Sequence, residues 1–375
     1  MAATHRIAHL QRALQAAGLD LFVGVADAYH SFLDCDPLVA LGGFRAMGPS
    51  AVVLRADGEG WLLVAPRWDT PRARAQAPHL HVLEAPDLPV ALGQLLRQLG
   101  PKSVGTAYPE SMPAGLADRL ADCLGTLPQP PRTVEASALV RRAGAVKTAD
   151  ELADAREATR IAEAGYLHLL EVMRPGMREF ELASDILHFM KVLGSPDNFL
   201  LMSASQHNQA VRPPGRRVLE RGDVLLAEIT PVYNNQFSQI CRTVTLGAAS
   251  ERRKERFSLL QSAYAAGMAA ARPGATVADA ARAMNRVLTE GGLGAYCRPP
   301  YMRVRGHGLG TISQLPGDVA EDNPTVLEEG MVFVMHPNQY CPDVGYMLCG
   351  EPVLIGPEGA VALSASAAQL DSIPA

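Results

Sequence analysis

Two ten-residue stretches, 219–228 and 327–336, look like copies of each other, and each ends on a side chain that can carry a proton. The first reads LERGDVLLAE and ends at Glu228, and the second reads LEEGMVFVMH and ends at His336. Carboxylates and imidazoles are common general acids and bases in enzymes. If the two copies face one another, Glu228 and His336 share one cleft in which acid–base chemistry can take place.

A second signature is repeated upstream of both stretches. Arg174-Pro175-Gly176 and Arg272-Pro273-Gly274 each end a helical pattern. Repetition at a fixed order indicates that one unit, here a helix and a strand, occurs twice. The sequence therefore predicts two related halves that close on each other.

Further polar residues are expected beside Glu228 because its strand returns through a tight turn. Tyr233–Gln236 is a turn sequence, and the chain beyond it is apolar enough to form an antiparallel partner strand. This register places Cys241 opposite Glu228 and Gln239 two residues nearer the turn. Cys241 is interpreted either as a nucleophile, if an imidazole stabilises its thiolate, or as a small buried residue.

The other candidate residues approach His307. The alternation of Tyr301 to Arg305 predicts a strand that leads to His307, with Arg303 and Arg305 on one face. Two arginines so placed form either a clamp for a substrate carboxylate or ion pairs at the rim. His207 lies in a loop and is a further candidate for substrate contact.

These residues need a scaffold of two domains. The first part of the chain alternates helical and strand patterns around a hairpin signal at Asp57-Gly58, which predicts an α/β domain over residues 1–140. A second domain, 145–375, begins at a capping box in which Thr148 and Glu151 bond reciprocally. The expected helices are Arg6–Ala17, Leu88–Leu99, Ala114–Leu124, Leu152–Met173 and Glu179–Val192, and the expected strands are Leu19–Val25, Ser50–Leu54, Gly60–Ala65, Asn198–Met202, Asp223–Val232 and Phe237–Leu246.

Composition restricts the kind of partner. The chain has 375 residues, of which 48% are hydrophobic, and a formal charge of −5. A negative charge gives no electrostatic reason to expect nucleic acid or an anionic membrane, so the expected partner is a small molecule. The first 18 residues suit an amphipathic helix, and six scattered cysteines indicate neither a disulfide framework nor a zinc knuckle. The expected compartment is the reducing cytoplasm.

The order and spacing of these motifs resemble the prolidase, methionine aminopeptidase and creatinase superfamily. The resemblance rests on the capping helix, the two Arg-Pro-Gly signatures and the segments Leu219–Thr243, Gly306–Gly310, Met331–Tyr340 and Glu351–Ile355. It implies an α+β fold with an N-terminal creatinase- or prolidase-like α/β domain. It also implies a C-terminal pita-bread domain with an internal pseudo-twofold repeat, usually in a homodimer, with the site on the concave face of the sheet.

The resemblance does not extend to the metal centre. Metallopeptidases of this superfamily bind two divalent metals through Asp, Asp, His, Glu and Glu. The matching positions here are Glu228, Gln239, His307, His336 and Gly350. Two hard cations need several anionic oxygens, and this set contains one carboxylate. No cofactor is therefore expected, and a single divalent metal bound by Glu228, His307 and His336 remains an alternative.

Some relatives work without metal, creatinase among them, and others are lyases. Creatinase's own residues are not conserved either, because its histidine falls at Val211 and two of its glutamates fall at Cys241 and His336. The expected function is metal-independent hydrolysis of a C–N bond in a small amide, amidine or guanidino compound. Glu228 and either His307 or His336 would exchange protons.

Other residues would support this chemistry, and two other functions remain open. Gln239 is expected to orient the substrate. Arg242 is expected to brace the site, with Glu351 as its partner or as a substrate contact. The first alternative is a metal-dependent, prolidase-like aminopeptidase or a lyase, and the second is a non-catalytic protein that binds small ligands.

Overall fold

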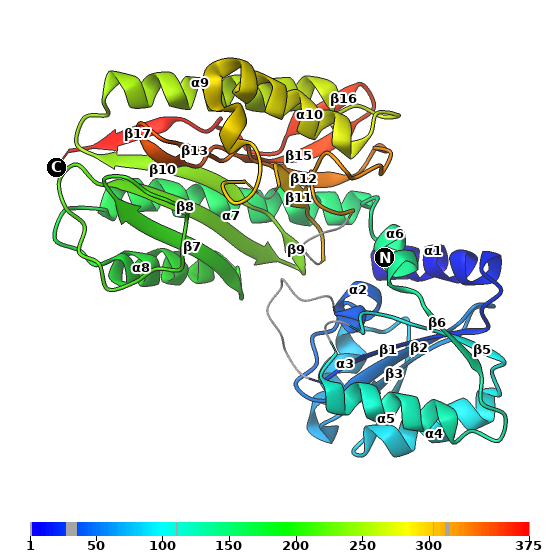
Figure 1. The fold of residues 1–375 in the computed structure, drawn as a ribbon. Helices are drawn as coiled ribbons and strands as arrows, with labels where there is room; N and C mark the ends of the chain where they lie inside the picture. Colours follow the sequence, from blue (N-terminus) through cyan, green and yellow to red (C-terminus); the bar gives the residue numbers. More distant parts are fainter. Residues whose placement is uncertain (1, 28–35, 110–111, 303, 312–315, 375) are drawn as a thin grey trace. The chain divides into compact units, whose positions relative to one another are not determined.

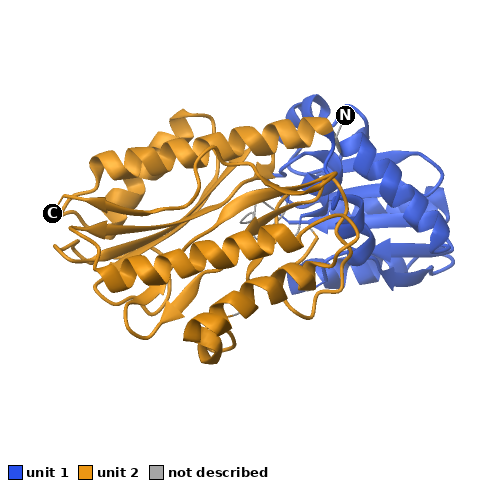
Figure 2. Ribbon diagram, turned by 90° about the horizontal axis from the view of Figure 1, so that it is seen from above, with its two compact units in different colours: residues 1–148, 311–313 blue, residues 149–310, 314–375 orange. Residues whose placement is uncertain are grey.

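The structure is a computed structural model that describes residues 2–27, 36–109, 112–302, 304–311 and 316–374. The chain divides into two compact units, coloured separately in Figure 2. Unit 1 comprises residues 1–148 and 311–313, and unit 2 comprises residues 149–310 and 314–375. No helix among the described residues is both long and apolar enough to cross a membrane.

Unit 1 is a six-stranded mixed sheet with helices packed against it (Figure 1). The strand order is β4-β3-β2-β1-β5-β6. The predicted hairpin at Asp57-Gly58 joins β2 to β3, and Val53 pairs with Trp61 across it. The elements are α1 (Ala2–Ala16), β1 (Leu21–Ala26), α2 (Pro37–Gly42), β2 (Ser50–Arg55), β3 (Gly60–Val64), α3 (Thr70–Gln76), β4 (His81–Glu84), α4 (Leu88–Leu99), β5 (Ser103–Thr106), α5 (Ala114–Gly125), β6 (Arg132–Glu135) and α6 (Ser137–Ala143).

Unit 2 contains two larger sheets and a two-stranded hairpin, with helices packed beside them (Figure 1). The strand order of the first sheet is β17-β10-β8-β7, with β9 also paired to β8; that of the second is β11-β12-β15-β16, and the hairpin is β13-β14. The elements are α7 (Ala149–Val172), α8 (Glu179–Val192), β7 (Asn198–Ser205), β8 (Val224–Tyr233), β9 (Gln236–Phe237), β10 (Ile240–Leu246), α9 (Glu251–Ala270), α10 (Val277–Leu288), β11 (Gly306–Gly308), β12 (Val332–Met335), β13 (Gln339–Cys341), β14 (Gly345–Met347), β15 (Glu351–Gly356), β16 (Gly359–Ala362) and β17 (Leu370–Ile373).

A reciprocal pair of backbone bonds joins the two sheets of unit 2. The Cys241 N–H donates to the Gly350 carbonyl at 3.0 Å, and the Gly350 N–H donates to the Cys241 carbonyl at 3.2 Å. Helices α7 and α8 cover one face of the first sheet, where Leu225, Ala227 and Ile229 of β8 are buried in the core. Because side chains alternate along a strand, the even-numbered residues of β8 face the other way.

Matching backbone hydrogen bonds and φ angles confirm the internal repeat that the sequence predicted. The Gly176 N–H donates to the Leu219 carbonyl at 2.9 Å, and the Gly274 N–H donates to the Leu327 carbonyl at 3.0 Å. The φ angle is 92° at Gly176, 86° at Gly274, 89° at Gly222 and 88° at Gly330. Since side chains other than glycine are strained at such angles, both copies fix the same pair of turns.

The α+β, two-unit fold is the expected one, and helices α4 and α8 have the predicted bounds. Two details were wrong. Phe180 was expected to face inward but is 40% exposed, while Leu182, Ile186 and Met190 of the same helix are fully buried. The predicted strand over Tyr301–Arg305 is absent from its described residues, because the strand begins only at Gly306.

Candidate functional site

A row of residues crosses the middle of the sheet in unit 2. Glu228 pairs with Leu201 on one side and with Cys241 on the other, and Cys241 in turn pairs with Gly350. Cys241 lies directly opposite Glu228, as the turn geometry predicted. Directly opposed residues project from the same face, so this row forms the floor of the candidate site. His336 borders the row, since a Cβ built on Gly350 would lie only 2.4 Å from the Cβ of His336.

Glu228 is the carboxylate of this floor. It is packed among protein atoms, and burial raises its pKa to about 7, although part of its side chain stays open to solvent. Among the described residues, no Lys, Arg or His forms an ion pair with it. A carboxyl group with such a pKa can give and take a proton near neutral pH.

The two histidines lie next to each other. The ring centroids of His307 and His336 are 5.9 Å apart and the rings are inclined at 71°. Burial lowers the pKa of both, that of His336 to about 3, so both are neutral at pH 7. The Nδ1 of His307 donates to the Gly308 carbonyl at 3.0 Å, which leaves its Nε2 as an acceptor.

His336 carries an unused polar atom. Its side chain is 8% exposed, and its Nδ1 has no hydrogen-bond partner among the described residues. Buried polar atoms are rarely left without a partner in a finished protein. The atom is therefore available to a substrate or a water molecule.

Asn338 contacts both Glu228 and Cys241 of the floor, and no sequence pattern predicted this role. Its Nδ2 lies 3.3 Å from Glu228 Oε1 and 3.8 Å from Cys241 Sγ, and its Oδ1 accepts the Cys349 N–H at 2.9 Å. Its spacing of two residues from His336 is the one signal that could have suggested a shared face.

Gln239 and Cys241 complete the floor. Gln239 lies in the gap between β9 and β10 and donates to Cys241 Sγ at 3.7 Å. Cys241 is fully buried, and burial followed by the charge of Glu228 raises the pKa of its thiol well above the usual value. The predicted roles of Cys241 as a nucleophile or substrate contact are therefore not supported, and it is a small buried residue.

The comparisons with known proteins give the family. The profile of metallopeptidase family M24 matches residues 153–361, which is more than half of the chain. The chain belongs to metallopeptidase family M24.

Several M24 relatives are similar in sequence. The Xaa-Pro dipeptidase of Pyrococcus furiosus is 30% identical over 230 residues, which span 60% of this chain and 64% of that enzyme. The probable dipeptidase PepE of Mycobacterium tuberculosis is 29% identical over 279 residues, or 74% of this chain and 72% of that protein.

Solved structures agree in fold over the whole chain. Dipeptidase PepE from Mycobacterium ulcerans superposes with a TM-score of 0.83 at 25% identity, covering 100% of this chain and 98% of that one. Xaa-Pro dipeptidase from Bacillus anthracis gives a TM-score of 0.85 at 22% identity, covering 99% and 100%. These likenesses establish the pita-bread fold of unit 2.

The residues of this M24 protein do not fit a dinuclear metal centre. Among the residues that the structure describes, no group of three or more His, Cys, Asp and Glu side chains is placed to bind a metal ion. Gly350 supplies no ligand, and the backbone leaves no room for one, since a Cβ there would also lie 2.9 Å from the Met335 carbonyl oxygen. The set expected for a single metal, Glu228 with His307 and His336, is not gathered either.

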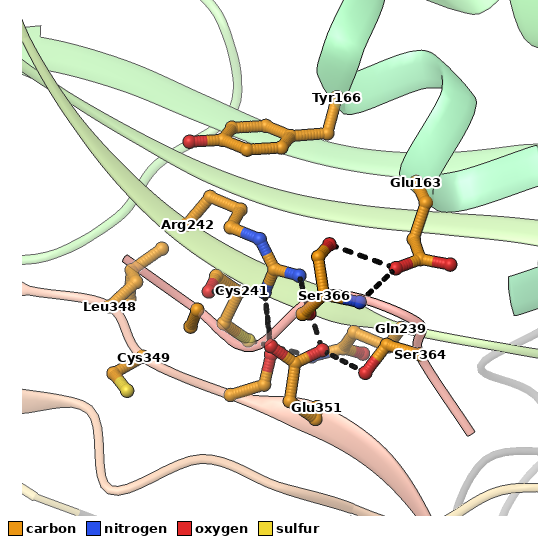
Figure 3. A network of polar contacts seen from close by, with 12 residues as sticks. Glu163, Tyr166, Gln239, Cys241, Arg242, Leu348, Cys349, Glu351, Ser364 and Ser366 are labelled. Atoms are coloured by element: carbon orange, nitrogen blue, oxygen red, sulfur yellow. Dashed lines mark hydrogen bonds and ion pairs between the residues drawn. The ribbon is translucent and has the colours of Figure 1, made fainter. Parts of the chain in front are cut away.

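Arg242 and Glu351 form a buried pair on the opposite side of β10 from Cys241 (Figure 3). Arg242 Nη1 lies 2.9 Å from Glu351 Oε1, and Nη2 donates to Oε2 at 3.1 Å. The Ser364 hydroxyl donates to the same Oε2 at 2.6 Å, and the ring of Tyr166 covers the guanidinium at 5.3 Å. Glu351 is therefore the partner of Arg242, which is one of the two roles predicted for it.

Arg305 has a different position from the predicted clamp. It is fully buried, and its donors bind Asn285 Oδ1 at 2.6 Å, the Asn338 carbonyl at 2.8 Å and Gln339 Oε1 at 2.8 Å. Since each of its three nitrogens donates to a protein acceptor and the side chain is fully buried, Arg305 braces the segment that carries Asn338. Arg303, the other half of the clamp, lies outside the described residues.

His207 and Tyr301, the last two candidates, meet at Tyr340. The ring of Tyr301 stacks on Tyr340 at 5.3 Å, and that of His207 lies edge-on to Tyr340 at 5.9 Å. The His207 Nε2 lies 3.1 Å from the Pro342 carbonyl oxygen. The rings of both residues therefore contact Tyr340.

Proposed function

We propose that this M24 protein hydrolyses a C–N bond in a small, peptide-like substrate, with Glu228 as the group that moves the proton. Membership in a metallopeptidase family and relatives named as dipeptidases support the reaction class. The observation that carries the proposal is the placement of Glu228, a partly exposed residue, in a row of paired residues on one sheet face that ends at His336.

The reaction needs a base for the attacking water and an acid for the leaving nitrogen. Glu228 in its ionised form takes the proton from water, and the same carboxyl then delivers it to the nitrogen as the C–N bond breaks. His307 and His336 stay neutral, so we assign them to hydrogen bonding and not to proton transfer. Asn338 holds the Glu228 carboxylate in position from the floor.

We further propose that no pair of metal ions takes part. The replacement of the usual ligands by Gln239, His336 and Gly350 supports this. The relatives favour the other reading, a metal-dependent dipeptidase, for which Glu228, His307 and His336 would have to come together around one ion. When bound, such an ion would supply Lewis-acid activation of water or of the carbonyl group.

Elemental mass spectrometry decides between the two candidates. The protein is purified without chelator or metal-binding tag, and its activity on a dipeptide panel is measured before and after dialysis against EDTA. We expect much less than one ion per chain and unchanged activity. One tightly bound ion per chain, lost from Glu228→Gln together with activity, would establish the metal-dependent candidate.

The histidines provide a second test. We expect His307→Ala to lower kcat/KM by about 10²-fold or more, because it removes a hydrogen-bonding group from the site. The control is His188→Ala, an exposed residue of α8, the helix that covers the sheet face opposite to that of Glu228. Equal losses in both variants, or none in His307→Ala with its circular dichroism intact, would place the site elsewhere.

A further inference from the structure

Three tyrosines form a compact aromatic group in unit 2. The ring centroids are 4.9 Å apart for Tyr296 and Tyr301, 5.6 Å for Tyr296 and Tyr340, and 5.3 Å for Tyr301 and Tyr340. Tyr301 is 43% exposed, and the other two are half-buried. The group therefore presents ring faces and edges to the outside.

The hairpin of β13 and β14 links this group to Glu228. Tyr340 pairs directly with Tyr346, so both side chains project from the same face of the hairpin. Tyr346 packs against the cluster that contains Leu226 and Cys241, and Cys241 lies directly opposite Glu228. Tyr346 of the hairpin thus lies against the floor that carries Glu228, and Tyr340 belongs to the exposed group.

A buried polar brace fixes the aromatic group in place. Gln339 Nε2 donates to the carbonyl groups of Tyr296 at 2.9 Å and Tyr340 at 3.0 Å, while its Oε1 accepts from Arg305. Gln339 and Arg305 are both fully buried. Buried polar groups whose bonds are satisfied hold a single geometry, so the rings form a fixed surface.

Charge around the group favours a neutral ligand. The nearby acid Asp343 is already paired with Arg252 at 2.5 Å and Arg256 at 2.9 Å. The buried Arg305 guanidinium donates to Gln339 Oε1 of the same hairpin. Asp343 is therefore not free to pair with a cationic side chain, whereas a neutral ring can pack on the faces and edges of the tyrosines.

We propose that Tyr296, Tyr301, Tyr340 and Tyr346 form a recognition wall that binds an uncharged aromatic side chain of the substrate next to the bond attacked at Glu228. This inference rests on the proposed function for the location of the reaction. The wall selects substrates by ring stacking and leaves the proton chemistry to Glu228.

Kinetics with matched dipeptides test the wall. Substrates that differ only in carrying Phe, Leu, Lys or Glu beside the scissile bond are compared. We expect the wild type to prefer Phe, and Tyr301→Ala to raise KM for the Phe substrate by about 3- to 10-fold. Tyr301→Phe keeps the ring and should keep the preference. Phe180→Ala, another exposed aromatic residue of unit 2, is the control.

A binding measurement separates failure of the wall from failure of the proposed reaction. N-acetylphenylalaninamide and N-acetyllysinamide are titrated into the full chain by calorimetry. Tighter binding of the aromatic amide, weakened by Tyr301→Ala and not by Phe180→Ala, supports the wall even if no dipeptide is cleaved. Equal binding of both amides, or an aromatic preference unaffected by Tyr301→Ala, overturns the wall even if hydrolysis is found.

Discussion

Glu228→Gln is expected to lower kcat/KM by about 10²- to 10⁴-fold, the usual range for losing a general acid–base group. Glutamine has nearly the same size and can still accept the hydrogen bond from Asn338, so the floor of the site stays in place. What is lost is the ability to take a proton from water and return it. Steady-state kinetics on the best substrate, with circular dichroism as the control for folding, measure this.

The same substitution is expected to stabilise the protein at alkaline pH. The unfolded chain releases the Glu228 proton near pH 4.5, whereas burial holds the pKa near 7 in the folded state. The uncharged carboxyl group therefore contributes its full stability below about pH 4.5, and this contribution is lost as the pH rises through about 7. Above that pH the wild type carries a buried charge that costs up to about 3 kcal/mol.

Chemical denaturation at pH 5 and pH 8 tests whether the substitution raises or lowers the free energy of unfolding. Glu228→Gln should be more stable than the wild type at pH 8 by up to about 3 kcal/mol, and the difference should shrink at pH 5. A variant that is less stable than the wild type at pH 8 would mean that the carboxylate is ionised and held by a positive partner. A bound metal ion would be such a partner.

The second large effect concerns the buried pair shown in Figure 3. Arg242→Met and Glu351→Gln should each destabilise unit 2 by about 3–5 kcal/mol, because each leaves the other group without its charged partner inside the protein. The pair lies on the opposite side of β10 from Glu228. We therefore expect these substitutions to lower the fraction of folded protein and to leave kcat/KM of the folded molecules unchanged.

The double variant is the matched control for this pair. Arg242→Met combined with Glu351→Leu removes both charges and should recover most of the lost stability, because no isolated charge remains. Urea denaturation of Arg242→Met, Glu351→Leu and the double variant measures the coupling. Additive losses in the double variant would show that the two side chains act independently.

The sequence was sufficient where neighbours along the chain decide the structure. Cys241 was placed opposite Glu228 because the turn between them is short, and the positive φ angles of Asn234 (44°) and Asn235 (64°) are those of a tight hairpin. The repeat was readable because both copies need glycine at equivalent turns.

Sequence reasoning failed where contacts join distant segments. Asn338 reaches Glu228 only because Cys241 pairs with Gly350 across the two sheets, and no local pattern encodes that pairing. The prediction that Arg305 forms a clamp was wrong for the same reason. Its alternation with Arg303 suggested a surface clamp, but its partner Asn285 comes from α10, and the match can be seen only after folding.

The crowding between Gly350 and His336 restricts how this site can change by substitution. Any side chain at position 350 would meet backbone atoms of β12 and the residue that follows it, the Met335 oxygen at 2.9 Å and the His336 Cα at 3.0 Å. Restoring the glutamate of the metal-binding relatives there would require the two strands to move apart. A metal centre therefore cannot be rebuilt here one side chain at a time, and engineering or evolution would have to alter the strand spacing first.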